Sequence, residues 1–332
     1  MNKKITFIGS GAWASALASV LSKNNNSVTL WGIDHDEIND INKGLNSKYF
    51  KDAKFNNPQN IKATLSLNEA LSDFDYLVLA VPSGAIVSVL SQIKEIIKDK
   101  KINIINVAKG IESQSKKFFS EILMSKFSDN IKNYCTLIGP SFAVEVFHNC
   151  LTMVNIVGPN TKYLHEVAHI FNNDTFGAVI NEDEQGSELF ASLKNVLAIG
   201  IGMINYMMPY QNSQAALLSI GVKEIDQIYK TMFPKGSDKL GFELAGIGDI
   251  FLTCSSPKSR NFSFGYEVAK EGLENTLKKN KKTIEGFHNA KILEDILTQY
   301  PSLHVPFLRS IIDVLYHQKQ TKQLLDFISS YK

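Results

Sequence analysis

Two charged residues lie in apolar surroundings in the second half of the chain, where they could take part in proton transfer. Lys194 interrupts the apolar run of residues 190–199. Such a lysine either extends its ammonium group to solvent or is held inside, where it can exchange a proton with a carbonyl oxygen. Asp249 lies beside two glycines in the apolar stretch 244–253, and it is either exposed or paired with a cation. We predict an ion pair between them, because the carboxylate would offset the desolvation of the ammonium group.

A polar turn follows Asp249 and is suited to binding a small anion. Residues 255–263 lead into a predicted helix and include Arg260, one of only two arginines among 35 Lys and Arg residues. A guanidinium group binds phosphate at two points, and a helix N-terminus presents free amides to an anion. Arg260 is therefore our candidate phosphate ligand, and the alternative is an ordinary exposed arginine.

The N-terminal segment carries a dinucleotide-binding pattern. An apolar run at residues 5–8 passes into the sequence GSGAWA at residues 9–14, which opens a predicted helix. In such a loop the first glycine permits a tight turn and the second lets the backbone approach a pyrophosphate, while the small third residue lets helix and strand pack closely. The alternative is a glycine turn without a ligand. We expect NAD or NADP to bind at this dinucleotide loop.

The end of the second predicted strand bears on the choice between these cofactors. Asp34 lies 23 residues after Gly11, where an acidic residue would meet the adenosine ribose, and the alternative is an unpaired exposed aspartate. Ile33 offers no charge to a 2′-phosphate and Asp34 would repel one, so we expect NADH to be used at least as well as NADPH. Lys43 or Lys48 could fold back and supply the missing charge.

Two further loops follow predicted strands of the first half. Lys109 follows the strand of residues 102–107, and Ser141 follows that of residues 136–138. Ligands of open α/β sheets bind at the carboxyl ends of strands, so Lys109 could contact a substrate phosphate or hydroxyl group. The amides of residues 139–143 and the Ser141 hydroxyl could do the same, unless this serine only caps a helix.

The predicted elements divide the chain into two domains of different class. Helical stretches such as residues 13–22 and 85–97 alternate with β-rich runs, which predicts a parallel sheet with crossover helices. These runs lie at residues 5–8, 28–31, 76–81, 102–107 and 136–138. Beyond residue 181 helical patterns take over, beginning with a helix over residues 183–206. The sequence therefore predicts an α/β fold, with an N-terminal doubly wound Rossmann domain (1–180) and an all-helical substrate-binding and catalytic domain (181–332).

Composition excludes several classes of protein. The 332 residues are 44% hydrophobic with a net charge of +2, which gives a substantial core and no basis for a nucleic-acid or anionic-membrane partner. The three cysteines lack C-x-x-C spacing, which argues against a disulfide framework and a zinc site. We find no signal peptide, and the most apolar helical stretch, 196–208, is too short to span a membrane. We expect a cytoplasmic protein without a bound metal, and a homodimer is compatible with the sequence.

Taken in order, these motifs resemble those of the NAD(P)-dependent glycerol-3-phosphate dehydrogenase family, and the resemblance runs from residue 8 to about residue 289. Besides the dinucleotide loop, the matching segments are VPS at 81–83, KG at 109–110, GPSFA at 139–143, KNVLAI at 194–199, LAGIGDIFLTC at 244–254, SPKSRN at 256–261 and IEG at 284–286. The resemblance implies interconversion of dihydroxyacetone phosphate and sn-glycerol 3-phosphate by hydride transfer with NADH or NADPH, supplying glycerol 3-phosphate for phospholipid synthesis.

The resemblance also implies roles for individual residues. Lys194 would be the proton-transfer residue, and Asp249 would work with it. Substrate contacts would come from Lys109, Gly139, Ser141, Lys194, Asp249, Thr253, Ser259, Arg260 and Asn261. Cofactor contacts would come from Gly9, Ser10, Gly11, Ala12, Trp13, Lys109, Ala143, Arg260 and Glu285, with Ile33 and Asp34 at the adenosine end.

The sequence departs from the family pattern at three places, and two other functions stay open. Ala14 replaces the usual third glycine, Ile33 stands where many NADP-using relatives carry Arg or His, and residues 287–289 follow the family only loosely. One alternative is a two-domain dehydrogenase of a small hydroxy acid, similar to ketopantoate reductase, whose substrate carries a carboxylate. The other is a dinucleotide-sensing protein without turnover. A requirement for a phosphate group on the substrate would distinguish the family's activity from the first alternative. Oxidation of NADH or NADPH with dihydroxyacetone phosphate would distinguish it from the second.

Overall fold

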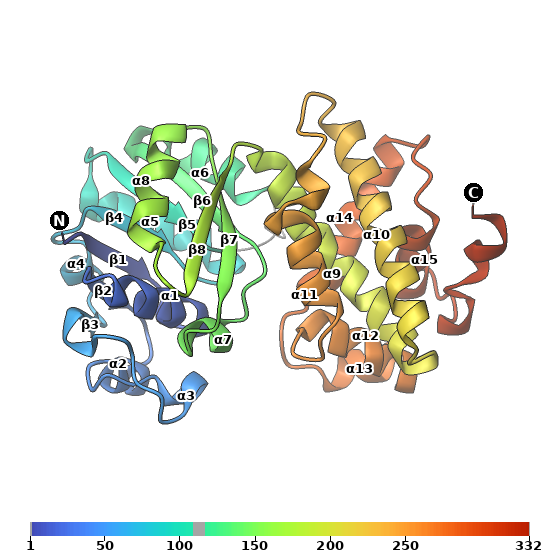
Figure 1. The fold of residues 1–332 in the computed structure, drawn as a ribbon, viewed down its shortest axis with the longest axis horizontal. Helices are drawn as coiled ribbons and strands as arrows, with labels where there is room; N and C mark the ends of the chain where they lie inside the picture. Colours follow the sequence, from blue (N-terminus) through green and yellow to red (C-terminus); the bar gives the residue numbers. More distant parts are fainter. Residues whose placement is uncertain (1, 109–116, 332) are drawn as a thin grey trace. The chain divides into compact units, whose positions relative to one another are not determined.

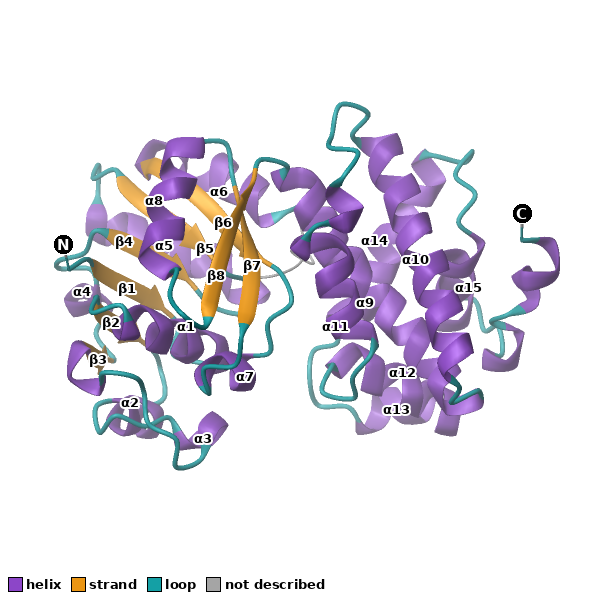
Figure 2. Cartoon of the chain, viewed as in Figure 1, coloured by secondary structure: helices purple, strands orange, loops and turns teal. Residues whose placement is uncertain are grey.

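The computed structural model describes residues 2–108 and 117–331 and divides into two compact units. The first unit is Met1–Glu184 and the second is Gln185–Lys332. All strands of the described residues belong to the first unit, whereas the second is built from helices (Figures 1 and 2). This is the α/β architecture with a helical second half that the sequence predicts.

The first unit is built on an eight-stranded sheet with the order β3-β2-β1-β4-β5-β6-β7-β8. The strands are β1 (Lys4–Ile8), β2 (Ser27–Trp31), β3 (Ile61–Thr64), β4 (Tyr76–Leu79), β5 (Ile102–Asn106), β6 (Ile131–Ile138), β7 (Thr152–Val157) and β8 (Phe176–Asn181). Strands β1 to β6 are parallel, and the strand order reverses between β1 and β4. Dinucleotides bind at the carboxyl ends of strands beside such a reversal.

The far edge of this sheet differs from the purely parallel sheet that the sequence predicts. Strand β7 is antiparallel to β6, and β8 runs parallel to β7. Neither of these strands was predicted, nor was β3. Buried strands are apolar whatever their direction, so the pattern of residues does not reveal which way a strand runs.

Helices cover both faces of the sheet. On one face, α1 (Ala12–Lys23), α7 (Ala143–Phe147) and α8 (Thr161–Phe171) bury side chains such as Phe7 of β1. On the other face, α5 (Ile86–Ile97) and α6 (Phe119–Phe127) bury the next strand residue, Ile8. Because successive side chains of a strand point to opposite faces, a fully apolar strand requires a helical layer on each side. The short helices α2 (His35–Ile41), α3 (Ser47–Phe50) and α4 (Leu67–Ala70) lie between β2 and β4 along the chain.

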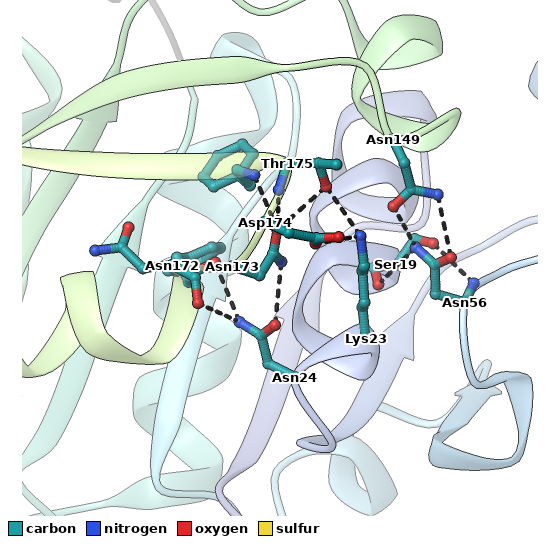
Figure 3. Close-up of polar contacts among 11 residues, drawn as sticks. Ser19, Lys23, Asn24, Asn56, Asn149, Asn172, Asn173, Asp174 and Thr175 are labelled. Carbon is teal, nitrogen blue, oxygen red and sulfur yellow. Dashed lines mark hydrogen bonds and ion pairs between the residues drawn. The ribbon is translucent and has the colours of Figure 1, made fainter.

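Polar side chains fasten the C-terminal end of α1 to the segment that follows α8 (Figure 3). The Asn24 side-chain amide donates to the carbonyl oxygens of Ile170 and Phe171 at 2.8 and 3.1 Å. Lys23 forms an ion pair with Asp174 at 2.6 Å. The last carbonyl groups of a helix have no hydrogen-bond donor within the helix, and the Asn24 side chain provides a donor for those of α8. These contacts fix the position of α1, whose other end begins at the dinucleotide loop.

The second unit is a bundle of helices around α9 (Glu184–Met207). Every residue of α9 from 186 to 204 is buried. Among the described helices, α9 alone is long and apolar enough to cross a membrane, but its apolar stretch is entirely buried inside the protein. A helix that is apolar on all sides is a core helix when other helices surround it. The other α-helices of this unit are α10 (Gln211–Met232), α11 (Asp249–Cys254), α12 (Arg260–Glu271), α13 (Leu273–Lys279), α14 (Glu285–Gln299) and α15 (Pro306–Tyr316).

Candidate functional site

Lys194 and Asp249 form a buried ion pair in the helical unit, as the sequence predicts. Their side chains are only 4% and 2% exposed. Lys194 lies on α9 and Asp249 is the first residue of α11, so the pair joins the core helix to a neighbour. Removal of one partner of a buried pair leaves an uncompensated charge and costs about 3–5 kcal/mol. The ammonium group of Lys194 is therefore held in place by its carboxylate partner.

The backbone before Asp249 explains the glycines of this stretch. Residues Leu244–Gly248 form a kinked turn, in which Gly246 has the non-helical angles φ −87° and ψ −110°, and this turn packs against the one before it. A Cβ atom added at Gly246 would lie 2.3 Å from the carbonyl oxygen of Leu240, which no side chain tolerates. The turn delivers Asp249 to the start of α11, where the Thr253 hydroxyl donates to the Asp249 carbonyl oxygen at 2.6 Å and lies 3.5 Å from its Oδ1. Thr253 therefore lies beside the carboxylate of Asp249.

Asn195, next to Lys194, belongs to a set of hydrogen bonds that joins three helices. Asn261 donates from Nδ2 to Asn195 Oδ1 at 2.9 Å, and Asn195 donates from Nδ2 to Glu285 Oε2 at 3.1 Å. The Asn261 Oδ1 atom accepts from the amide of Gly286 at 2.9 Å. Asn261 is a predicted substrate contact, and its amide also ties α12 to both α9 and α14. Asn195 received no role from the sequence, although a carboxamide in an apolar helix is itself a signal of buried hydrogen bonding.

Arg260 is the first residue of α12, and its side chain is 56% exposed. Its Nη2 atom lies 3.5 Å from Oε1 of Glu285, the first residue of α14. Ser259 is the N-cap of α12, and its hydroxyl accepts a hydrogen bond from the Phe262 amide at 3.3 Å. Ser259 thus orders the helix start, and the exposed guanidinium group stands at the positive end of the helix dipole. An anion is favoured at this position.

Three glycines let α12 and α14 approach α9 at backbone distance. A Cβ atom added at Gly265 would lie 1.9 Å from a carbonyl oxygen of α9, and one at Gly202 would lie 2.0 Å from a carbonyl oxygen of α12. A Cβ atom at Gly286 would lie 2.3 Å from the carbonyl oxygen of Asn195. In each case the overlap is with backbone, so a change of rotamer cannot relieve it. The positions of Arg260 and Glu285 relative to α9 therefore depend on these glycines.

The dinucleotide loop of the first unit has a shape and polarity that fit a pyrophosphate. Gly9 has φ of +120°, and a Cβ atom there would lie 2.7 Å from the carbonyl oxygen of Ala80, so only glycine fits. Above Gly11 the space is open, since the nearest atom to an added Cβ is the Tyr49 hydroxyl at 3.9 Å. No side chain of the described residues caps α1, whose N-cap is Gly11. The N-terminus of α1 therefore begins beside open space at Gly11, where the helix dipole favours an anion.

The neighbouring residues of the loop divide between core and surface. Ala14 is 1% exposed and packs between helix and sheet, as a small third residue should. Ser10 is buried, and its hydroxyl lies against Gly32, where an added Cβ atom would be 2.2 Å from it. Ala12 and Trp13 begin α1 and are half-buried. These positions suit contacts to a bound dinucleotide through backbone and apolar surface.

Asp34 is not the unpaired aspartate of the alternative interpretation. Its Oδ1 accepts from the amides of Asp36 and Glu37 and caps α2, while its Oδ2 accepts from Lys48 Nζ at 3.0 Å. The Lys48 ammonium group and the Glu37 amide lower the pKa of Asp34. Lys48 also lies 3.1 Å from Glu37 Oε2. A hollow of about 510 Å³ adjoins these side chains, and Ile33 beside them is 83% exposed.

Three predicted substrate or cofactor residues lie just beyond β6. A Cβ atom at Gly139 would lie 2.9 Å from the Val154 Cα atom, so the close approach of β7 requires glycine. The Ser141 hydroxyl donates to the Gly139 carbonyl oxygen at 3.0 Å, and Ala143 is the first residue of α7. Since β1 and β6 run in the same direction, these residues share the carboxyl edge of the sheet with the dinucleotide loop. Lys109 lies outside the described residues.

The cysteines and acidic residues show no sign of redox or metal chemistry in the described residues. Cys135, Cys150 and Cys254 are free thiols. Burial raises the pKa of Cys135 and Cys254 well above the ordinary value, so these thiols are unreactive. Within 2–108 and 117–331, no three His, Cys, Asp or Glu side chains gather as metal ligands would.

Comparison with known proteins identifies the family. A model of the N-terminal part of NAD-dependent glycerol-3-phosphate dehydrogenase matches residues 4–164, and one of the C-terminal part matches residues 183–326. A glycerol-3-phosphate dehydrogenase [NAD(P)+] of Malacoplasma penetrans is 44% identical over 318 residues, 95% of this chain and 93% of the relative. One of Mesoplasma florum is 35% identical over 98% of this chain and 96% of the relative. The crystal structure of glycerol-3-phosphate dehydrogenase from Coxiella burnetii superposes with a TM-score of 0.86 at 26% identity, covering 99% of each chain. This chain therefore belongs to the NAD-dependent glycerol-3-phosphate dehydrogenase family.

Proposed function

We propose that this protein interconverts dihydroxyacetone phosphate and sn-glycerol 3-phosphate with NADH or NADPH. The observation that carries the proposal is the buried Lys194–Asp249 pair, which lies in the same helical unit as an exposed arginine at a helix start. The buried ion pair suits proton transfer during reduction of a carbonyl group, and the exposed arginine suits the binding of a phosphate group. The nicotinamide supplies the hydride when it is bound.

Lys194 acts in this proposal as the general acid during reduction. Its Nζ atom donates a proton to the oxygen at C2 of the substrate, and it accepts that proton back in the reverse direction. Asp249 holds the Lys194 ammonium group in a buried ion pair and so orients it before the transfer. Acid–base catalysis of this kind contributes typically ~10²–10⁴-fold to the rate.

Arg260 recognises the phosphate group. It has a planar fork of donors at the N-terminus of α12, where the helix dipole also favours an anion. Ser259 and Asn261 support this position through the helix cap and the contacts to α9 and α14. A substrate that carries only a carboxylate, as in ketopantoate reductase, would not need the same geometry.

The other site residues keep the roles that the family resemblance implies. Lys109, Gly139, Ser141 and Thr253 complete the substrate contacts. Cofactor contacts come from Gly9, Ser10, Gly11, Ala12, Trp13, Ile33, Asp34, Lys109, Ala143, Arg260 and Glu285. In this proposal residues 1–180 are the dinucleotide-binding domain and 181–332 the substrate domain. The free cysteines suit a cytoplasmic enzyme, and we propose a homodimer as its assembly.

A double-mutant cycle on the buried pair tests the proposal. We expect Lys194→Ala to lower kcat by ~10²–10⁴-fold while NADH still binds, because the lysine acts on the substrate oxygen. Asp249→Asn should also lower kcat, and the double variant should lose far less than the product of the two losses. The matched control is the surface pair Lys230–Asp226 at 2.9 Å on α10, whose removal should leave kcat unchanged.

Two outcomes would contradict the proposal. A Lys194→Ala variant within threefold of the wild-type kcat would exclude Lys194 as the proton donor. A wild-type protein that binds NADH but does not oxidise it with dihydroxyacetone phosphate would favour a dinucleotide-sensing function instead.

A further inference from the structure

Asn46 lies directly behind the dinucleotide loop and was given no role by the sequence. It is fully buried, in the turn between α2 and α3. Its Nδ2 group donates to the carbonyl oxygen of Ser10 at 3.1 Å and to the Ser15 hydroxyl at 2.9 Å. The Ser15 hydroxyl in turn donates to the same Ser10 oxygen at 2.9 Å. Two side chains from different segments therefore hold one backbone carbonyl group of the loop.

This carbonyl group sets the direction of the amide that follows it. The Ser10 carbonyl and the Gly11 N–H belong to one planar trans peptide unit, so they point in opposite directions. Holding the oxygen against Asn46 and Ser15 turns the Gly11 N–H away from them. Glycine adopts positive and negative φ almost equally, so without such a restraint the peptide before Gly11 could rotate and turn this donor inward.

The segment that carries Asn46 is itself anchored beside the loop. Phe50, at the end of α3, stacks on Phe147 of α7 with ring centroids 3.8 Å apart and planes 3° from parallel. The Tyr49 hydroxyl of the same short helix lies near Gly11. The helix thus holds Asn46 at a fixed distance from Ser10. The Asn46 Oδ1 atom is buried and has no hydrogen-bond partner among the described residues. The side-chain hydrogen bonds of Asn46 are therefore those that its Nδ2 group donates to Ser10 and Ser15.

We propose that Asn46 is a positioning residue for cofactor binding, which fixes the Ser10–Gly11 peptide so that its N–H faces the pyrophosphate. The proposal rests on the proposed function, since it takes the dinucleotide loop as the NAD(P) site. Asn46 acts through the loop backbone and not on the reacting atoms. Its loss should therefore weaken cofactor binding and spare the catalytic step.

The test compares two changes at Asn46 with a matched change nearby. Asn46→Ala removes both contacts, and Asn46→Asp keeps the size of the side chain but puts acceptor oxygens in place of the N–H donor facing the Ser10 carbonyl. The control is Asn42→Ala, because Asn42 also makes two hydrogen bonds, to the amide and the carbonyl of Ala63, but none to the loop. Binding of NADH is measured by fluorescence titration, and binding of ADP, which contains the pyrophosphate without the nicotinamide, by calorimetry.

We expect both Asn46 variants to bind NADH and ADP about 10-fold or more weakly, by similar factors, while kcat at saturating NADH and the KM for dihydroxyacetone phosphate change little. Ser15→Ala should give a smaller loss in the same direction, and it serves if an Asn46 variant does not fold. Affinities within twofold of wild type would overturn the proposal, as would an equal loss in Asn42→Ala. A wild-type protein that binds neither ligand would instead overturn the proposed function.

Discussion

Replacement of Gly286 by alanine sets two physical effects against each other. Gly286 is the second residue of α14, and alanine there would favour the helix by up to about 1 kcal/mol through propensity alone. However, the added Cβ atom would lie 2.3 Å from the Asn195 carbonyl oxygen, more than 1 Å inside the 3.4 Å of ordinary contact. Because the neighbour is backbone, α14 must move away from α9 by about that amount. Overpacking of this kind costs typically 1–3 kcal/mol, which exceeds the gain from propensity.

The displacement should also be visible in catalysis. The start of α14 carries Glu285, which contacts both Asn195 and Arg260, and the Gly286 amide donates to Asn261. A misplacement of about 1 Å in such a site can cost on the order of 10²-fold in rate. We expect Gly286→Ala to lower the Tm by a few degrees in calorimetry and kcat/KM for dihydroxyacetone phosphate by roughly 10–100-fold.

The control for this prediction is another glycine of the same unit. A Cβ atom at Gly241 would meet only ordinary contacts, at 3.6 and 3.9 Å, so Gly241→Ala should leave both measurements close to wild type. If Gly286→Ala raised the Tm and kept kcat/KM within twofold, propensity would outweigh the close approach and the reasoning would be refuted.

Three other predictions follow from the charges of the molecule. Arg260→Lys should lower kcat/KM for dihydroxyacetone phosphate by roughly 10–150-fold and change little for unphosphorylated dihydroxyacetone, because only the bidentate contact is lost; equal losses on both would exclude phosphate recognition. Lys48→Gln should raise the ratio of kcat/KM for NADH over NADPH, because Asp34 then faces a 2′-phosphate without its cation; an unchanged ratio would place Lys48 outside the cofactor site. Burial raises the pKa of Glu224 to about 7, against hydrogen bonds from the start of α15. The folded state thus favours the protonated form of Glu224. The contribution of this group to the free energy of unfolding is therefore full below about pH 4.5 and is lost as the pH rises through about 7. Its size is about 3 kcal/mol at 1.36 kcal/mol per pKa unit. Denaturant titrations from pH 4.5 to 8 should show a smaller fall in the free energy of unfolding for Glu224→Gln, and parallel curves would contradict the assignment.

The sequence predicts the parts of this molecule that have short-range signals. The dinucleotide loop, the helix of α9 and the alternation of helices with β1, β2, β4, β5 and β6 all follow from local pattern, and the Lys194–Asp249 pair follows from the cost of an isolated buried charge. The carboxamide of Asn195 in an apolar helix signals a buried hydrogen bond, but its partners lie far along the chain and local pattern does not name them. Asn46 carries no such signal, because asparagine is common in turns and its role depends on segments distant in the chain. The same is true of Gly202, which reads as an ordinary helical glycine until the backbone of α12 is seen against it. Strands β7 and β8 were missed because Asn155, Gly177 and Asn181 interrupt their short apolar runs, and asparagine and glycine are depleted in strands.

The burial of α9 has a consequence for synthesis of the protein. Its cover comes from side chains and backbone of α10, α12, α14 and α15, all of which follow it in the chain. The last of these helices ends at Tyr316, 109 residues after α9 ends at Met207. At roughly 5–20 residues per second, a ribosome needs about 5–20 s to produce that cover. During this interval the nascent chain exposes a 24-residue apolar helix, long enough to be mistaken for a membrane segment, and co-translational chaperones that bind apolar surface should have their main target on this chain here.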